Sequence, residues 1–263
     1  MPHLSAVQMV LAVLSGGVVG FTLGLIGGGG SILAVPLLLY VVGVHDPHIV
    51  IGSTALAVAV NAYLNLLPHW RQGHVRWKAA VAFAIPGAVG AYAGSALGKM
   101  ANDRVLLFLF ALLMLVIAAR MLRSKRRGGT MDGEHAIRMS RVIPTGLVTG
   151  GVSGFFGIGG GFLIVPGLMF SAGLPMTEAI GTSLFSVGTF GLTTAVSYAV
   201  SGMVDWLIVG LYIGGGLVGG AFGVYACTRI GRNARRLQQM FAGVLVLVAG
   251  YMLYVNLTAL HVL

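Results

Sequence analysis

The chain has 263 residues, of which 57% are hydrophobic and only 8% are charged, with a formal net charge of +10. A soluble domain carries about 25% charged residues, so this composition excludes a soluble fold and predicts an all-α, multi-pass membrane protein. The Lys and Arg residues lie in short loops between apolar runs, where membrane proteins keep cytoplasmic charge, which excludes nucleic acid as a partner. The single cysteine, Cys227, excludes an intramolecular disulfide, and no Cys/His spacing typical of a metal site occurs.

Apolar runs along the chain predict the membrane segments, because a bilayer core of about 30 Å needs roughly 20 residues per helix. In chain order the runs are 4–26, 30–43, 49–67, 79–98, 105–121, 142–156, 160–173, 178–199, 207–228 and 237–257. We expect a polytopic helical bundle of about 8 to 10 transmembrane segments. The runs 30–43, 142–156 and 160–173 are too short for full spans and predict half-helices or tight hairpins. Such segments persist at that depth only when buried in protein or lining a wet cavity.

The two halves of the chain repeat each other. Residues 24–36, GLIGGGGSILAVP, return as residues 154–166, GFFGIGGGFLIVP, and residues 73–77, GHVRW, return as 202–206, GMVDW. The repeat predicts a first transmembrane unit over 1–122, a basic cytoplasmic linker over 123–141, and a second transmembrane unit over 142–263. Matched glycine and proline interruptions in two halves point to the substrate site of a transporter.

Loop charges predict that the two repeats have opposite orientations in the membrane. Arg71, Arg76 and Lys78 give the loop before Trp77 a charge of +3, whereas the equivalent loop before Trp206 carries only Asp205. The next pair of loops reverses this difference, with +1 near residues 99–104 and +4 over 229–236. Positive loops face the cytoplasm, so equivalent loops lie on opposite sides and the repeats are inverted.

The glycine clusters are the first candidate binding elements. Glycine allows the backbone to leave the helix, and a helix that begins just after the cluster points free N–H groups and its positive end toward an anion. The predicted residues are Gly27, Gly28, Gly29, Gly30, Ser31, Gly157, Gly159, Gly160 and Gly161. The alternative is close helix packing, which is our interpretation of the glycines spaced by four, namely Gly16, Gly20, Gly24, Gly146, Gly150 and Gly154.

Polar residues inside the long apolar runs form a second candidate set. The hydroxyls of Ser53, Thr54, Thr182, Ser183 and Ser186 could contact anionic oxygens, and the alternative is that they bond to carbonyls of their own helix. Asn61 and Asn65 are one turn apart in an apolar run. Burial of an amide without partners is unfavourable, so each must pair across helices or line a cavity. We include Asn61 in the predicted substrate site.

The sequence lacks the residue patterns of several kinds of chemistry. All six acidic residues and all seven histidines fall in loops or at the ends of the apolar runs, so no proton relay is expected in mid-membrane. No Lys-Ser/Thr follows a glycine loop, which excludes a P-loop ATPase. We therefore expect no enzyme activity, no cofactor and no metal.

The duplicated glycine cluster with Val-Pro and the paired Gly-x-Val-x-Trp resemble the sulfite exporter TauE/SafE family of bacterial membrane proteins. The resemblance extends from about Gly16 to Tyr254. It implies transport of small sulfur-containing anions, such as sulfite or organosulfonates, by export through a midplane site between the repeats. It also implies a multi-pass protein of the bacterial inner membrane, with the lipid bilayer and a small anion as partners; a homo-oligomer is left open. The alternatives are an anion channel and a membrane subunit without transport activity of its own.

Overall fold

The computed structural model describes residues 4–123, 139–157, 159, 161–230, 243 and 246–255. Over these residues the chain forms helices and no strand, as the composition predicts. Within the described ranges, five helices are long and apolar enough to cross a membrane: Ala6–Ile26, Pro47–Arg71, Trp77–Met100, Met176–Val200 and Trp206–Ala226. Most of the predicted basic linker lies outside the described residues.

The chain divides into two compact units, and each unit takes residues from both repeats. The first comprises residues 1–100 and 137–228, and the second comprises residues 101–136 and 229–263. The second unit contains α5 (Asp103–Arg123) and a helix at Val246–Val255. Every predicted site residue belongs to the first unit.

The helices of the first unit follow one order in both repeats. The first repeat contains α1 (Ala6–Ile26), the short helical stretches η1 (Gly27–Leu33), α2 (Ala34–Pro36) and η2 (Leu37–Val41), and then α3 (Pro47–Arg71) and α4 (Trp77–Met100). The second repeat contains α6 (Met139–Phe156), α7 (Gly161–Ser171), α8 (Met176–Val200) and α9 (Trp206–Ile230). Thus α1, α3 and α4 correspond to α6, α8 and α9.

Local capping explains where several of these helices begin. The Ser5 hydroxyl accepts from the Gln8 backbone N–H, and the Gln8 side chain accepts from the Ser5 N–H. The two bonds form a capping box at the N-terminus of α1. The Asp46 carboxylate accepts from the N–H groups of residues 48 and 49 and caps α3. The Asp205 carboxylate accepts from the N–H groups of residues 207 and 208 and begins α9.

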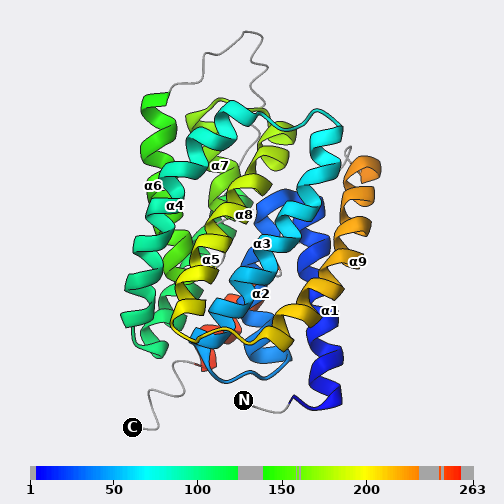
Figure 1. The fold of residues 1–263 in the computed structure, drawn as a ribbon, viewed down its shortest axis with the longest axis vertical. Helices are drawn as coiled ribbons and strands as arrows, with labels where there is room; N and C mark the ends of the chain where they lie inside the picture. The colour runs from blue at the N-terminus through cyan, green and yellow to red at the C-terminus, as the bar shows by residue number, and fades with distance from the viewer. Residues whose placement is uncertain are drawn as a thin grey trace. The chain divides into compact units, whose positions relative to one another are not determined.

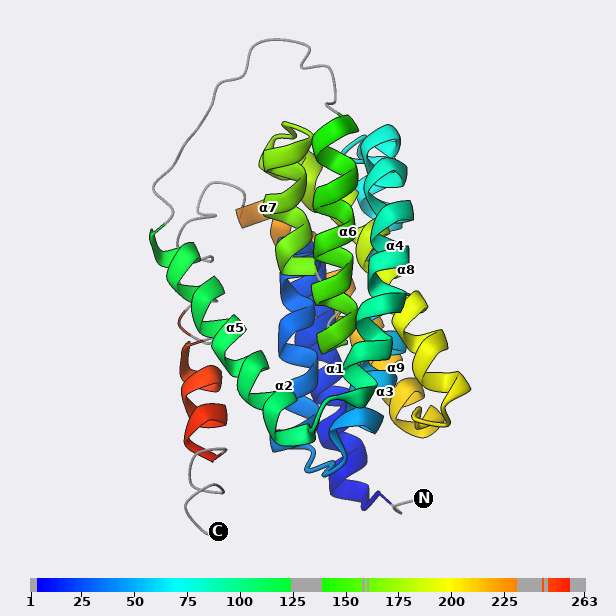
Figure 2. The ribbon, with the colours of Figure 1, turned by 90° about the vertical axis from the view of Figure 1, so that its left-hand side faces the viewer.

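Equivalent helices run in opposite directions, as the loop charges predict. In Figure 1, α1, α3 and α9 run upward from the end of the unit where the N-terminus lies, whereas α6, α8 and α4 run downward. Each repeat begins with a hairpin. The chain rises along α1, turns at the first glycine cluster and returns through η1, α2 and η2, while α6 and α7 form the opposite hairpin from the other end (Figures 1 and 2). The two glycine clusters are therefore the turns of two inverted hairpins.

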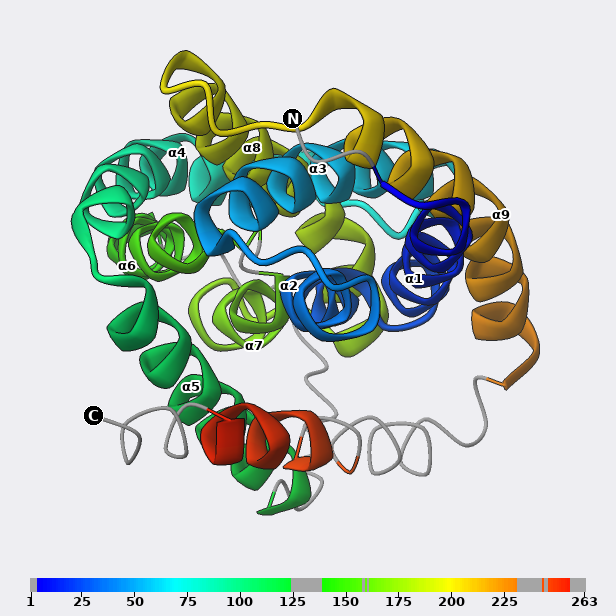
Figure 3. The same cartoon turned by 90° about the horizontal axis from the view of Figure 1, so that it is seen from below.

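The glycines spaced by four pack helices together, as predicted, and they do so between the two repeats. A Cβ on Gly20 of α1 would collide with the Gly216 backbone of α9, and a Cβ on Gly150 of α6 would collide with the Gly87 backbone of α4. Figure 3 shows these two pairs, α1 with α9 and α4 with α6, on either side of the unit. Since Gly87 and Gly216 are equivalent, the first helix of each repeat packs on the third long helix of the other.

The centre of the unit is formed by α3, α8 and the two returning segments. The long helices α3 and α8 pack against each other, and η1 packs against α7 (Figure 3). In addition, α7 and η1 both contact α8. This arrangement brings both glycine turns against the central pair of long helices.

Candidate functional site

Each glycine turn docks on the long helix of the opposite repeat. Gly27 has φ +71°, and a Cβ there would lie 2.9 Å from Cγ2 of Ile180 on α8. Gly157 has φ +65°, and a Cβ there would overlap Cγ2 of Ile51 on α3. Ile51 and Ile180 are equivalent residues of the repeats. The two turns therefore use glycine for the same two reasons, a left-handed backbone and a close approach to an isoleucine.

Gly159 places the second turn at the middle of the central helices. Its φ is +64°, and a Cβ there would lie 3.3 Å from Cγ1 of Val58 and 3.2 Å from Cγ1 of Val187. These valines are equivalent, and each lies near the midpoint of a 25-residue helix. A helix of that length extends about 37 Å, so the turn lies about halfway along the two central helices.

The first turn is held by hydroxyl groups. The Ser183 hydroxyl accepts from the Gly28 N–H at 3.4 Å and donates to the Ile180 carbonyl at 2.7 Å. Within the turn, the Ser31 hydroxyl donates to the Gly28 carbonyl at 2.9 Å. Thr54, the equivalent of Ser183, donates to a carbonyl one turn earlier in α3 at 2.7 Å. For Thr54 and Ser183, bonding to the helix's own carbonyls, the alternative named from the sequence, is therefore present in the structure.

The remaining glycines of the two clusters have different surroundings. Gly30 packs so closely on α1 that a Cβ would collide with the Thr22 side chain, and Gly29 lies beside it within η1. Gly161 is the first residue of α7. Gly160 lies outside the described residues. The described parts of the clusters thus lie at the two turns, as the repeat pattern predicts.

Ser53 and Thr182 connect the repeats away from the turns. The Ser53 hydroxyl on α3 accepts from the Asp205 N–H at 2.9 Å, and the Thr182 hydroxyl on α8 accepts from the Arg76 N–H at 3.0 Å. Asp205 and Arg76 are equivalent residues that immediately precede the tryptophans of α9 and α4. Each hydroxyl therefore anchors the loop of the other repeat, and these two predicted site residues do not lie at the glycine turns.

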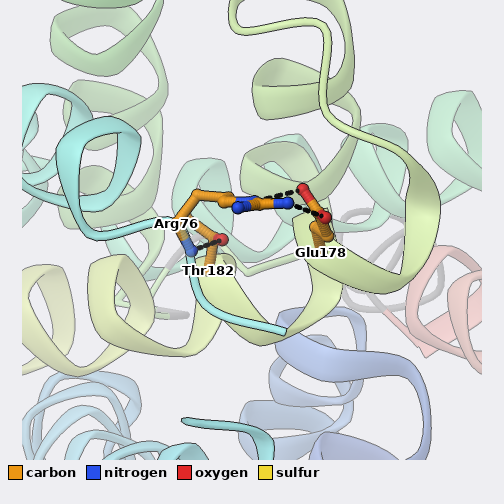
Figure 4. A network of polar contacts seen from close by, with 3 residues as sticks. All are labelled: Arg76, Glu178 and Thr182. Carbon is orange, nitrogen blue, oxygen red and sulfur yellow. Dashed lines mark hydrogen bonds and ion pairs between the residues drawn. The ribbon is translucent and has the colours of Figure 1, made fainter. Parts of the chain in front are cut away.

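An ion pair strengthens only one of these two anchors. The Arg76 Nε donates to Oε2 of Glu178 at 2.7 Å, and a terminal guanidinium nitrogen donates to Oε1 at 2.6 Å (Figure 4). The hydrogen bond to Glu178 and its negative charge raise the pKa of Arg76. Figure 4 shows the guanidinium on the Glu178 side of the loop, with Thr182 below the Arg76 backbone. Sequence reasoning missed the pair because its members are 102 residues apart.

Asn61 and Ser186 are fully buried polar residues. Both have 0% exposure, and among the described residues neither the Asn61 amide nor the Ser186 hydroxyl has a hydrogen-bond partner. An unsatisfied buried polar group costs about 1–3 kcal/mol. Asn61 lies against Gly216, where a Cβ would collide with its amide. The structure therefore places Asn61 between α3 and α9, beside the turns rather than in them.

A polar column on α3 extends from Asn61 toward one end of the helix. The Asn65 amide donates to the Asn61 carbonyl at 2.9 Å, and the His69 ring lies 3.5 Å from the Gly24 carbonyl of α1. His69 is only 4% exposed although it belongs to the last turn of α3. Sequence reasoning placed His69 at a segment end and did not predict its burial. Asn61, Asn65 and His69 are spaced by four residues and so share one face of the helix, and this spacing could have predicted the burial of His69.

Comparison with known proteins gives one family. The sequence model of the sulfite exporter TauE/SafE family matches residues 12–252. A "probable membrane transporter protein" of Xylella fastidiosa is 47% identical over 249 residues, which cover 94% of this chain and 95% of that protein. The "probable membrane transporter protein YunE" of Bacillus subtilis is 29% identical, with coverages of 82% and 87%. No solved structure matches the chain.

Proposed function

The chain belongs to the sulfite exporter TauE/SafE family, and on that premise we propose that it exports small oxyanions of the sulfite or organosulfonate kind across the bacterial inner membrane. The relatives are named as membrane transporters, which agrees with a multi-pass protein that moves a solute. The observation that carries the proposal is that two inverted glycine turns dock on the central pair α3 and α8, the first at Ile180 and the second at Ile51.

The turns have the chemistry that an anion requires. Each is followed by a helix, Gly30–Val41 in the first repeat and α7 in the second; Gly30 is buried, and so is Gly159, two residues before α7 begins. The first turn of a helix presents unpaired N–H groups, and the N-terminus carries roughly half a positive charge. Each such end can bind a small anion without any cationic side chain.

Neutral donors at the turns fit a small oxyanion better than a large solute. The hydroxyls of Ser31 and Ser183 lie at the first turn, Thr54 lies one helical turn from Ile51, and all three side chains are buried. Rotation of a hydroxyl from its own helix carbonyl toward a ligand needs no backbone movement. Ser186 and Asn61 supply buried polar groups next to this region. Gly28 contributes a backbone N–H group, which donates to Ser183 in this conformation.

Burial of the turns supports a carrier over an open channel. Gly27, Gly28, Gly30 and Ser31 are all buried in this conformation, so the proposed site requires a conformational change before it can exchange anion with water. A single anion then crosses with its full charge, because the proposed site contributes no charged side chain. A negative-inside potential favours its export by about 2.3 kcal/mol per charge per 100 mV, which is more than tenfold in concentration.

The test is flux into or out of proteoliposomes that contain the purified protein. Radiolabelled sulfite, thiosulfate and sulfoacetate are compared with phosphate and chloride, with a potassium diffusion potential and no pH or sodium gradient. Saturable, potential-driven flux of a sulfur oxyanion is the expected result. Single-channel currents would identify the channel instead, and the absence of flux for every anion relative to empty liposomes would contradict the proposal.

A further inference from the structure

The two ends of the central helix pair α3 and α8 carry different charged groups. At one end, Arg76 and Glu178 form the two-bonded ion pair. At the other end the equivalent residues are Asp205 and Ile49, and the Asp205 carboxylate caps its own helix. At these equivalent positions one end of the helix pair therefore has a guanidinium and the other a carboxylate.

A lysine also lies at the second end, but it is held elsewhere. The Lys99 ammonium donates to the Ser197 carbonyl and to the Ser201 hydroxyl, both at 3.0 Å. These acceptors belong to the C-terminal end of α8 and to the loop after it. Lys99 is thus bound to neutral oxygens, and it does not reproduce the ion pair of the first end.

The pair and the first glycine turn contact the same end of α8, on different faces of the helix. Glu178 is in the first turn of α8, and the next turn of α8 carries Ile180 and Ser183, which contact Gly27 and Gly28. The backbone N–H of Arg76 is anchored on Thr182 in the same part of α8. Glu178 and Thr182 therefore face the loop at Arg76, whereas Ile180 and Ser183 face the turn. An anion that binds Arg76 would be held at the end of α8 that carries the first glycine turn.

The chemistry of the pair matches that of the proposed substrate. A guanidinium binds a carboxylate through two parallel N–H···O bonds, and any oxyanion with two adjacent oxygens can use the same fork. Arg76 is 57% exposed, so water-borne anions can reach it, and Glu178 is 19% exposed. The loop of Arg76 also carries Arg71 and Lys78, which place this end in the cytoplasm by the loop-charge rule. Exported anions would approach from this side.

We propose that Arg76 is the cytoplasmic entry site for the transported oxyanion, and that the anion binds there by replacing Glu178 on the Arg76 guanidinium. The inference rests on the proposed function and names a residue for its first step. Glu178 acts as an internal competitor for the cation. At the opposite end the position equivalent to Arg76 is Asp205, and Lys99 is bound to neutral oxygens, which agrees with release of the anion there.

The two members of the pair should have opposite effects on substrate affinity. Glu178→Gln removes the competitor and should lower the KM for anion supplied from the cytoplasmic side by up to about fivefold, the range of exposed ion pairs. Arg76→Gln removes the cation and should raise that KM about tenfold or more, with Arg76→Lys between it and the wild type. A purely structural ion pair predicts that both changes act in the same direction.

The measurement is sulfite uptake into inside-out vesicles, with Asp205→Asn as the matched control at the other end and melting temperature as the check on folding. A second measurement is sulfite titration of the purified protein, followed by its tryptophan fluorescence, to which Trp77 next to Arg76 contributes. Opposite shifts in KM and in binding support the inference, and equal or absent shifts overturn it. If the wild type moves no oxyanion, the proposed function fails, while the titration still decides the role of Arg76.

Discussion

Gly159→Ala is the smallest change that tests the role of the glycine turns. The left-handed φ of +64° costs an alanine about 1–2 kcal/mol. The added Cβ would also lie 3.2 Å from Cγ1 of Val187 and 3.3 Å from Cγ1 of Val58. Two contacts this short in a packed interior add about 1–3 kcal/mol. The total, about 2–5 kcal/mol, lies below the 5–15 kcal/mol stability of typical proteins, so we expect folded protein in the membrane.

Gly202→Ala is the matched control for backbone strain. Gly202 has φ +72°, but a Cβ there would have nothing within 4 Å. The two variants therefore share the strain and differ in the contacts with the central valines. If those contacts must change during transport, the difference of about 1–3 kcal/mol corresponds to a roughly 5- to 150-fold lower flux for Gly159→Ala.

The assay compares the two variants with the wild type at equal protein amount. Membrane content is measured by immunoblot, thermal stability by size-exclusion chromatography after heating, and transport by oxyanion flux in proteoliposomes. We expect near-normal flux for Gly202→Ala and strongly reduced flux for Gly159→Ala. Equal flux in the two folded variants would refute the idea that the turn works through its approach to α3 and α8.

Three further predictions address topology, packing and the buried amide. In a background without the native cysteine, single cysteines should be labelled from the cytoplasm in the 123–141 linker and from outside at 200–205; labelling from one side would contradict the inverted repeats. Gly20→Leu should remove folded protein from the membrane because any Cβ there meets backbone, whereas Gly210→Leu faces open space and should leave the amount unchanged. Asn61→Leu removes two unpartnered buried polar atoms, so the melting temperature should be unchanged or higher while oxyanion flux falls; unchanged flux would exclude Asn61 from the site.

Periodicity and composition were sufficient to predict the membrane class and the architecture of the repeats. The inverted directions follow from loop charges, because the cytoplasmic preference of Lys and Arg acts on each loop separately. The glycines spaced by four could be assigned to packing because they share one helix face. The turns at Gly27 and Gly157 could be located because adjacent glycines interrupt an apolar run at matched positions.

The candidate site could be predicted only in part. Ser183 was expected near an anion, and the structure places it on the Gly28 N–H of the first turn. Ser53 has the same local sequence pattern as a binding hydroxyl, yet it anchors the loop at Asp205. A serine in an apolar run can donate to its own helix, accept from a distant loop or bind a ligand, and the neighbouring residues in sequence do not distinguish these roles.

Sequence alone determined what depends on local pattern: a membrane protein, two repeats, their opposite directions and the positions of two glycine turns. The tertiary structure decided which helices of the two repeats pack against each other and which hydroxyl groups hold loops. It also decided that Arg76 pairs with Glu178, which is 102 residues away in the sequence. The physical reason is that a close contact between distant segments depends on how the chain packs around it. The residues next to either member of such a contact do not indicate its partner. Helix periodicity and loop charge, in contrast, can be recognised from consecutive residues.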